Sequence, residues 1–222
     1  MAPSTKKKNP ETGSDNISEK ITAAYIDHLL LKGAKPASVY EFTSKLKIAE
    51  QDFYAQFNSF EGLEKSIWAG FIQSTLDTLS ASEEYSSYPL KEKLLSFYYT
   101  FVEVLNMNRS FILQSADKGS AMLRQNTLSK ARGAFKDYVT RLMIEGTQSG
   151  EIVKRPYIVD KYPEALWLQL LFVLRFWIKD DSAGFEKTDA AIEKAVKVSF
   201  ELMGPGVIDS LVDMAKFLYQ NK

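Results

Sequence analysis

The sequence predicts an all-α protein, with a three-helix helix-turn-helix domain at the amino terminus and a larger helical domain after it. Three observations predict this class. Apolar residues recur at three- and four-residue steps along most of the chain. No alternation of apolar and polar residues, the signature of a half-buried strand, persists anywhere. Capping residues, glycines and prolines separate the periodic stretches from one another.

The first predicted helix runs from Asn16 to Gly33. Asn16 has an oxygen that suits an N-cap, and Glu19 stands three residues later, where a capping-box partner is expected. Gly33 suits the end of a helix because glycine adopts the left-handed backbone conformation without strain, and Pro36 follows at the usual distance. The pattern therefore predicts one long helix before the first turn.

Two short helices and a long one follow. Ser38, with Glu41 three residues later, predicts a capped helix over 39–46. A second short helix is expected over roughly 50–56, and Ser59 opens a longer amphipathic helix that reaches Leu79. Two short helices joined by only a few residues are typical of a helix-turn-helix.

The rest of the chain predicts further helices and suggests where the domains divide. The polar loop from Ser80 to Pro89 is the expected boundary. We expect residues 1–15 to form a disordered tail, 16–65 the helix-turn-helix domain with its fourth helix reaching about residue 80, and 81–222 the second domain. The helices predicted in that domain cover 90–107, 110–118, 120–148, 159–178, 185–203 and 207–219.

Composition excludes several classes of function. Lys and Arg number 28 and Asp and Glu also 28, so no net charge draws the whole chain to nucleic acid or an anionic membrane. There is no cysteine and a single histidine, His28, and we find no P-loop, GxGxxG, HExxH or GxSxG motif. We therefore expect no enzyme activity, no metal and no cofactor.

No targeting or membrane-spanning segment is expected. The basic run Lys6 to Lys8 is not followed by the apolar stretch of a secretion signal. The longest apolar run, Leu166 to Ile178, contains Gln169 and Arg175 and is too short to span a bilayer. The sequence therefore predicts a cytoplasmic protein without a membrane span.

The stretch from Ile21 to Trp68 resembles the amino-terminal domain of the TetR family of bacterial transcription regulators. The pattern Phe-Tyr-x-x-Phe at 53–57, followed by Ser-x-Glu-x-Leu at 59–63, is its most specific part. Beyond it the chain is similar only as a helical domain of suitable length. The resemblance implies a homodimer whose helix-turn-helix reads operator DNA and whose larger domain binds a small, often hydrophobic effector.

The resemblance also implies where each partner binds. The residues expected at DNA are Ser38, Lys45, Lys47, Glu50, Gln51 and Tyr54. The residues expected around a hydrophobic effector or lipid are Tyr98, Phe101, Phe111, Met122, Trp167, Phe172 and Arg175, because aromatic and Met side chains suit an apolar cavity. Arg175 lies in an apolar helix, and a buried guanidinium needs a partner. That partner is a carboxylate across the dimer, solvent, or an acidic ligand. The helices over 159–178 and 185–203 are expected to form the dimer interface.

The sequence departs from the family pattern where DNA would be read. Lys47-Ile48-Ala49 replaces the usual Gly-Val-Ser of the turn, so Ala49 cannot cap the second short helix with its side chain. Glu50 and Asp52 open that helix, and Phe60 stands where a Lys is usual. Residues 16–80 contain six Lys and eight Asp or Glu, a net charge of −2, and no arginine precedes Arg109.

Two hypotheses follow. In the first, the chain is a TetR-like, DNA-binding homodimer that responds to an effector, with the Lys6–Lys8 segment adding a contact to phosphate or to the minor groove. In the second, a TetR-like fold has lost DNA binding and binds a lipid or a partner protein, because an acidic recognition helix repels phosphates.

Overall fold

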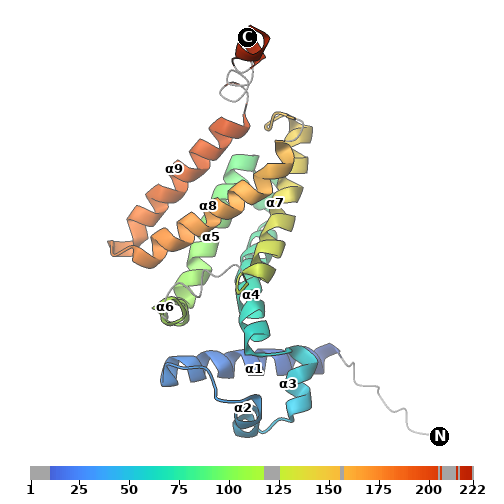
Figure 1. Cartoon of the computed structure of the whole chain (residues 1–222), viewed down its shortest axis with the longest axis vertical. Helices are drawn as coiled ribbons and strands as arrows, with labels where there is room; N and C mark the ends of the chain where they lie inside the picture. The colour runs from blue at the N-terminus through green and yellow to red at the C-terminus, as the bar shows by residue number, and fades with distance from the viewer. Residues whose placement is uncertain are drawn as a thin grey trace, which may run out of the picture. The chain divides into compact units, whose positions relative to one another are not determined.

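The computed structural model describes residues 11–117, 126–155, 158–204, 206, 214 and 216–221. Helices are the regular structure found in this part of the chain (Figure 1). The described residues form two compact units. The HTH unit contains residues up to Trp68 together with Asn108–Leu128, and the bundle unit contains Ala69–Met107 together with the residues from Ser129 onwards. The all-α class predicted from sequence is confirmed.

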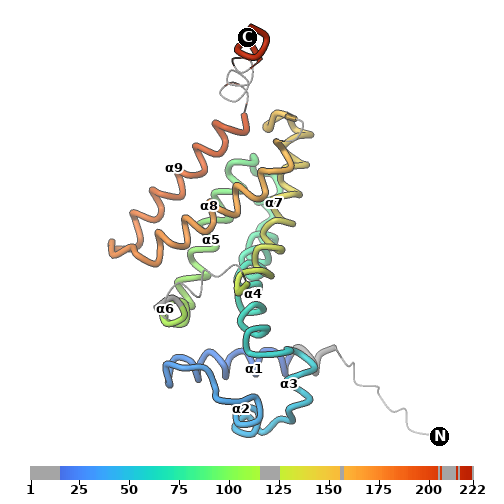
Figure 2. The backbone as a smooth tube through the Cα atoms, viewed as in Figure 1, coloured from blue at the N-terminus to red at the C-terminus, as the bar shows by residue number. Residues whose placement is uncertain are grey.

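The HTH unit is built on helix α1 (Glu11–Lys32), which is followed by α2 (Val39–Leu46) and α3 (Glu50–Gln56). Helix α3 packs against both α1 and α2, and α6 (Arg109–Asp117) packs along α1. The predicted start of the first helix at Asn16 is wrong, because α1 begins five residues earlier and Asn16 lies inside it. Both short helices begin and end where the sequence predicts. Figure 2 shows α2 and α3 following α1 along the chain.

An aromatic cluster forms the core of the HTH unit. Phe53 of α3 and Phe42 of α2 are buried, with ring centroids 6.3 Å apart. Phe60, the first residue of α4 (Phe60–Ser80), stacks on the buried Tyr25 of α1 at 5.5 Å and meets Phe53 edge-on at 5.5 Å. The side chain that departs from the family pattern at residue 60 therefore joins the core.

The bundle unit contains the later part of α4 and four further helices (Figure 1). Helix α5 packs against α7, α8 and α9, while α8 packs against both α7 and α9. The four helices are α5 (Leu90–Met107), α7 (Ser129–Ser149), α8 (Tyr162–Lys179) and α9 (Glu186–Met203). Short 3₁₀ segments precede three of these helices in the described chain: η1 (Glu84–Ser87) precedes α5, η3 (Val159–Lys161) precedes α8 and η4 (Ala183–Phe185) precedes α9.

The carboxyl-terminal half of the chain departs from the predictions in three places. Helix α8 begins at Tyr162, three residues after the predicted start, because residues 159–161 form η3. The helix predicted from residue 120 begins at Ser129, since residues 126–128 form a turn. Most of the helix predicted over 207–219 lies outside the described residues, but 216–220 are helical. The predicted helices over 90–107 and 185–203 agree with α5 and α9 within one residue.

Two buried polar groups fix the ends of α9. The carboxylate of Asp180 accepts hydrogen bonds from the backbone N–H and hydroxyl of Ser182 and from the same two groups of Thr188. At the other end, the buried guanidinium of Arg155 donates to the carbonyls of Leu202, Met203 and Gly204, at 3.1, 3.2 and 2.7 Å. Both groups satisfy backbone atoms that a helix end leaves unpaired.

Candidate functional site

The turn between α2 and α3 determines how α3 is presented. The hydroxyl of Ser38 accepts a hydrogen bond from the backbone N–H of Glu41 at 3.1 Å, so Ser38 caps α2 as predicted. Lys47 ends α2 in the left-handed conformation, with φ 55° and ψ 46°. That conformation costs a side chain about 1 kcal/mol or more relative to glycine, which explains why glycine is usual here.

Helix α3 is capped by its own third residue. Ala49 makes no side-chain capping bond, as the sequence predicts. The carboxylate of Asp52 instead accepts from the backbone N–H of Ala49 at 3.0 Å. The carboxylate of Asp52 is therefore held by the backbone at the start of the helix. The carboxylate of Glu50, in the same turn, has no partner among the described residues.

The solvent-facing side of the helix-turn-helix combines amide, phenol and ammonium groups. Gln51 is exposed, and Tyr54 is 50% exposed with its ring edge against Phe53 at 5.6 Å. Tyr40 on α2 is 69% exposed, and sequence reasoning had not selected it. Its only signal was an aromatic residue on the polar side of a short amphipathic helix. Such groups donate to phosphates and base edges.

Three lysines of the HTH unit bind acceptors within the same unit. Lys45 pairs with Glu41 at 2.5 Å, and Lys35 pairs with Glu64 at 2.8 Å. Lys20 donates to the carbonyl of Leu46 at 3.1 Å. Exposed Lys47, by contrast, has no acidic partner within the described part of the chain. Of the two lysines predicted at DNA, Lys47 is therefore the one whose charge is not neutralised nearby.

A buried polar link joins α4 to α1 within the HTH unit. The hydroxyl of Tyr25 donates to Glu64 of α4 at 2.7 Å, and Lys35 donates to the other oxygen of the same carboxylate. Burial is the largest effect on Tyr25 and raises the pKa of its hydroxyl, and the Glu64 bond adds to it. Tyr25 therefore remains a hydrogen-bond donor over the physiological range.

The residues predicted around an effector are dispersed. Tyr98, Phe101 and Trp167 are buried in the bundle unit, while Phe111 is buried on α6 of the HTH unit. Met122 lies outside the described residues. The rings of Phe97 and Phe101 stack at 5.9 Å, and those of Phe135 and Trp167 are 6.0 Å apart, so side chains fill this space.

Phe172 and Arg175 lie on the outer surface of α8. Phe172 is 49% exposed and lines an apolar groove of about 780 Å³ between α8 and α9, together with Phe176, Val198 and Leu202. Arg175 is exposed on the surface of the chain and is not buried in its core. The helix over 159–178 is thus apolar on both sides because one side faces the core and the other faces this groove.

Two further cavities of the bundle unit are lined by residues that were not predicted. One, of about 550 Å³, lies between α7 and the start of α8 and is lined by Met143, Lys154 and Pro163 among others. The other, of about 440 Å³, lies between α4, η1, α5 and α7 and contains Lys93, Tyr138, Arg141 and Glu145. Periodicity could not select Lys93 and Tyr138, because a polar side chain buried on an amphipathic helix has no distinct sequence signal.

In the part of the chain that the structure describes, no group of three or more His, Asp or Glu side chains is placed to hold a metal ion. No helix among the described ranges is long and apolar enough to cross a membrane.

A helix-turn-helix followed by a helical bundle defines the class of helical transcription regulators. Residues 93–218 match the family model described as "Tetracyclin repressor-like, C-terminal domain". The chain belongs to the TetR family. No curated protein matches its sequence.

Solved structures agree with this fold. A TetR-family regulator from Syntrophomonas wolfei is 19% identical with a TM-score of 0.64, covering 87% of this chain and 98% of its own. One from Shewanella sp. PV-4 is 17% identical, with a TM-score of 0.57 and coverages of 84% and 97%. The fatty acid degradation regulator FadR from Bacillus halodurans is 15% identical, with a TM-score of 0.55 and coverages of 88% and 97%. At these identities the likeness concerns the fold.

Proposed function

We propose that the protein is a DNA-binding homodimer that regulates transcription and responds to a small effector bound by its bundle unit. The observation that carries this proposal is the exposed surface of α3, where Gln51 and Tyr54 face solvent directly after a two-helix turn, in a chain of the TetR family. A short helix presented in this way suits the major groove, where amide and hydroxyl groups read base edges and phosphates.

Lys47 is the side chain we assign to a phosphate. It ends α2, is exposed, and is not neutralised by a described carboxylate. Tyr54 and Ser38 add hydroxyl groups, and Gln51 is assigned to a base edge because its amide offers both a donor and an acceptor. Lys45 must leave Glu41 before it can contact DNA, so we assign it a smaller contribution.

The groove between α8 and α9 is assigned to a second copy of the chain. Phe172, Val198 and Leu202 are each between 41% and 52% exposed there, which is unusual for apolar side chains in contact with water. A second copy of the chain, packed on the same surface around a twofold axis, would cover all of them. Phe172→Glu should therefore convert dimer to monomer in sedimentation-velocity experiments, whereas Ile144→Glu, on α7 outside the groove and 55% exposed, should leave the dimer intact.

Regulation would act through a population shift. Dimers populate arrangements that differ in the spacing of the two α3 helices, and only one spacing matches successive half-sites on DNA. Helix α4 is shared by the two units, because Phe60–Trp68 belong to the HTH unit and Ala69–Ser80 to the bundle unit.

Fluorescence anisotropy with labelled DNA from upstream of the protein's own gene tests the proposal. We expect affinity to fall steeply with salt, and Lys47→Gln to flatten the salt dependence by about one phosphate contact per subunit. Lys91→Gln, an exposed lysine at the start of α5, is the matched control and should not change the slope. Absence of binding at 50 mM salt would contradict the proposal.

The second candidate is a TetR-fold protein that does not bind DNA and binds a lipid or a partner protein. The specific observation in its favour is the charge of the HTH unit, where Glu50 opens α3 while Lys35 and Lys45 are held in ion pairs. This candidate predicts no binding to any duplex at low salt, with a lipid recovered by mass spectrometry from the purified protein.

A further inference from the structure

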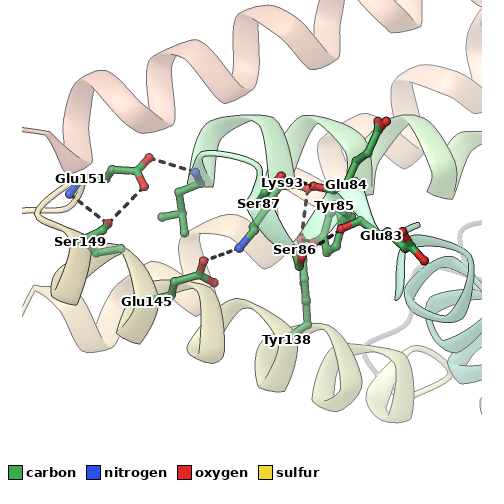
Figure 3. Close-up of polar contacts among 12 residues, drawn as sticks. Glu83, Glu84, Tyr85, Ser86, Ser87, Lys93, Tyr138, Glu145, Ser149 and Glu151 are labelled. Carbon is green, nitrogen blue, oxygen red and sulfur yellow. Dashed lines mark hydrogen bonds and ion pairs between the residues drawn. The ribbon is translucent and has the colours of Figure 1, made fainter. Parts of the chain in front are cut away.

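The cavity between α4, η1, α5 and α7 contains a buried cation. The side chain of Lys93 on α5 is only 7% exposed, and its ammonium pairs with Glu145 of α7, whose side chain is 50% exposed (Figure 3). A buried ammonium is costly unless hydrogen bonds satisfy it, and a half-exposed carboxylate compensates it weakly. An ammonium has three N–H donors, so one carboxylate leaves capacity for a further acceptor.

Two tyrosines form the wall beside Lys93. The hydroxyl oxygens of Tyr85 and Tyr138 are 2.9 Å apart, and Tyr138 donates to the backbone carbonyl of Lys93 at 3.3 Å (Figure 3). Since one hydroxyl has one proton, Tyr85 donates to Tyr138 in this arrangement. Burial raises the pKa of both hydroxyls, so they remain neutral donors. Tyr85 can turn its proton to an incoming anion with only a rotation of the O–H bond.

A second cation stands at the rim. Arg141 lies one helical turn before Glu145 on α7, lines the cavity and is exposed. No hydrogen bond or ion pair joins its guanidinium to a described residue. Of the acids in the lining, Asp77 of α4 already accepts from Gln73 at 2.8 Å, and Glu145 is held by Lys93. The groups of the cavity that can still form hydrogen bonds are therefore mainly donors, on Lys93 and Arg141.

The apolar part of the lining limits the rest of the ligand. Leu76 and Leu79 of α4 and Leu142 of α7 complete a cavity of about 440 Å³, near the lower end of the range for small-molecule sites. A ligand of this size that satisfies both cations carries one acidic group and a short apolar body.

We propose that this cavity binds a small carboxylate with an apolar body, and that it is the effector site. The carboxylate lies between Lys93 and Arg141, accepts from Tyr85, and displaces Glu145 towards solvent. Five lining residues come from α4, the helix that begins in the HTH unit, so occupancy acts directly on that helix. The assignment as effector site rests on the proposed function, whereas the binding itself does not.

Ligand binding is tested without DNA, by thermal unfolding and calorimetry of the full chain at constant ionic strength. Benzoate and hexanoate are the probes, benzamide and hexanamide are neutral controls of the same shape, and inorganic phosphate tests charge without an apolar body. We expect benzoate or hexanoate at 10 mM to raise Tm progressively with concentration, and the amides to have no effect. If neither carboxylate raises Tm, the proposal is wrong; if phosphate acts equally well, the apolar part of the assignment is wrong.

Two charge variants separate a binding site from a purely structural ion pair. Lys93→Gln should weaken carboxylate binding at least tenfold, while Glu145→Gln removes the competing anion and should tighten it at least threefold. Glu92→Gln, an exposed carboxylate outside the cavity, is the control. Loss of binding in both Lys93→Gln and Glu145→Gln would overturn the assignment. A protein that binds carboxylate but no DNA contradicts the proposed function alone, and one that binds DNA but no carboxylate contradicts this inference alone.

Discussion

Two glycines of α7 differ in what a methyl group would meet, and this difference predicts opposite effects of the same substitution. Gly133 is exposed and has no atom within 4 Å of an added Cβ. Gly146 is buried, and an added Cβ would lie 2.4 Å from Cδ2 of Leu90 and 2.9 Å from Cδ1 of Ile152. Carbon atoms normally approach to about 3.5–4.0 Å.

The magnitudes follow from these contacts. Alanine stabilises a helix interior by about 1 kcal/mol relative to glycine, so Gly133→Ala should increase the free energy of unfolding by nearly that amount. At residue 146 the same gain is opposed by overpacking, which costs about 1–3 kcal/mol. Leu90 and Ile152 are almost fully buried, so neither side chain can move aside into solvent. We expect Gly146→Ala to destabilise the protein by about 1 kcal/mol net.

Urea unfolding followed by far-UV circular dichroism measures both values, since helix content is the signal. The two variants should differ by about 2 kcal/mol, beyond the error of the midpoint comparison. Adding Leu90→Val to Gly146→Ala should recover part of the loss, because the two sites share one contact. A Gly146→Ala protein as stable as Gly133→Ala would refute the packing described around α5 and α7.

Three further predictions concern the HTH unit and the end of α8. Ala49→Ser should stabilise the HTH unit by about 0.5–1 kcal/mol in urea unfolding, because Ala49 already has the extended backbone of an N-cap and the new hydroxyl can accept from the N–H of Asp52; no gain would show that Asp52 already satisfies the turn. Glu50→Gln should tighten DNA binding about threefold in anisotropy titrations, since a charge about 6 Å from a phosphate in water costs ~0.7 kcal/mol; unchanged affinity would mean that Glu50 points away from DNA. Hydrogen bonds from Ser182 and Thr188 outweigh burial and hold the pKa of Asp180 below its ordinary value. Its contribution to stability is therefore present above the unfolded-state pKa of about 4 and is lost as pH falls through the lower folded-state pKa. Asp180→Ala should lower Tm at pH 7 and reduce the sensitivity of Tm to pH below 4, and an unchanged acid profile would contradict this role.

The sequence was sufficient for the features that depend on local chemistry. Ser38 caps α2 and Ala49 fails to cap α3, as their side chains dictate. The long-range features were not accessible. Nothing local indicates that Asp180 is buried and accepts four hydrogen bonds while the adjacent Asp181 stays exposed. Such properties arise when distant segments pack together.

The candidate sites also differ in how far the sequence predicts their residues. The residues of the helix-turn-helix could be selected because that motif lies within about fifty residues of sequence. The effector residues could not, because aromatic side chains such as Tyr98 and Trp167 fill a core as readily as they line a cavity. The polar cavity depends on Lys93 and Glu145, which are 52 residues apart and meet only when α5 packs against α7.

Hydroxyl-radical footprinting of the upstream DNA tests the central claim most directly, because one experiment examines both DNA binding and twofold assembly. A homodimer that reads DNA with α3 predicts two protected patches, symmetric about a centre and about one helical turn apart or a multiple of it. Phe172→Glu should abolish both patches together, and Tyr54→Ala should weaken both equally. Uniform cleavage of the duplex at low salt, or a single unpaired patch, would contradict the claim.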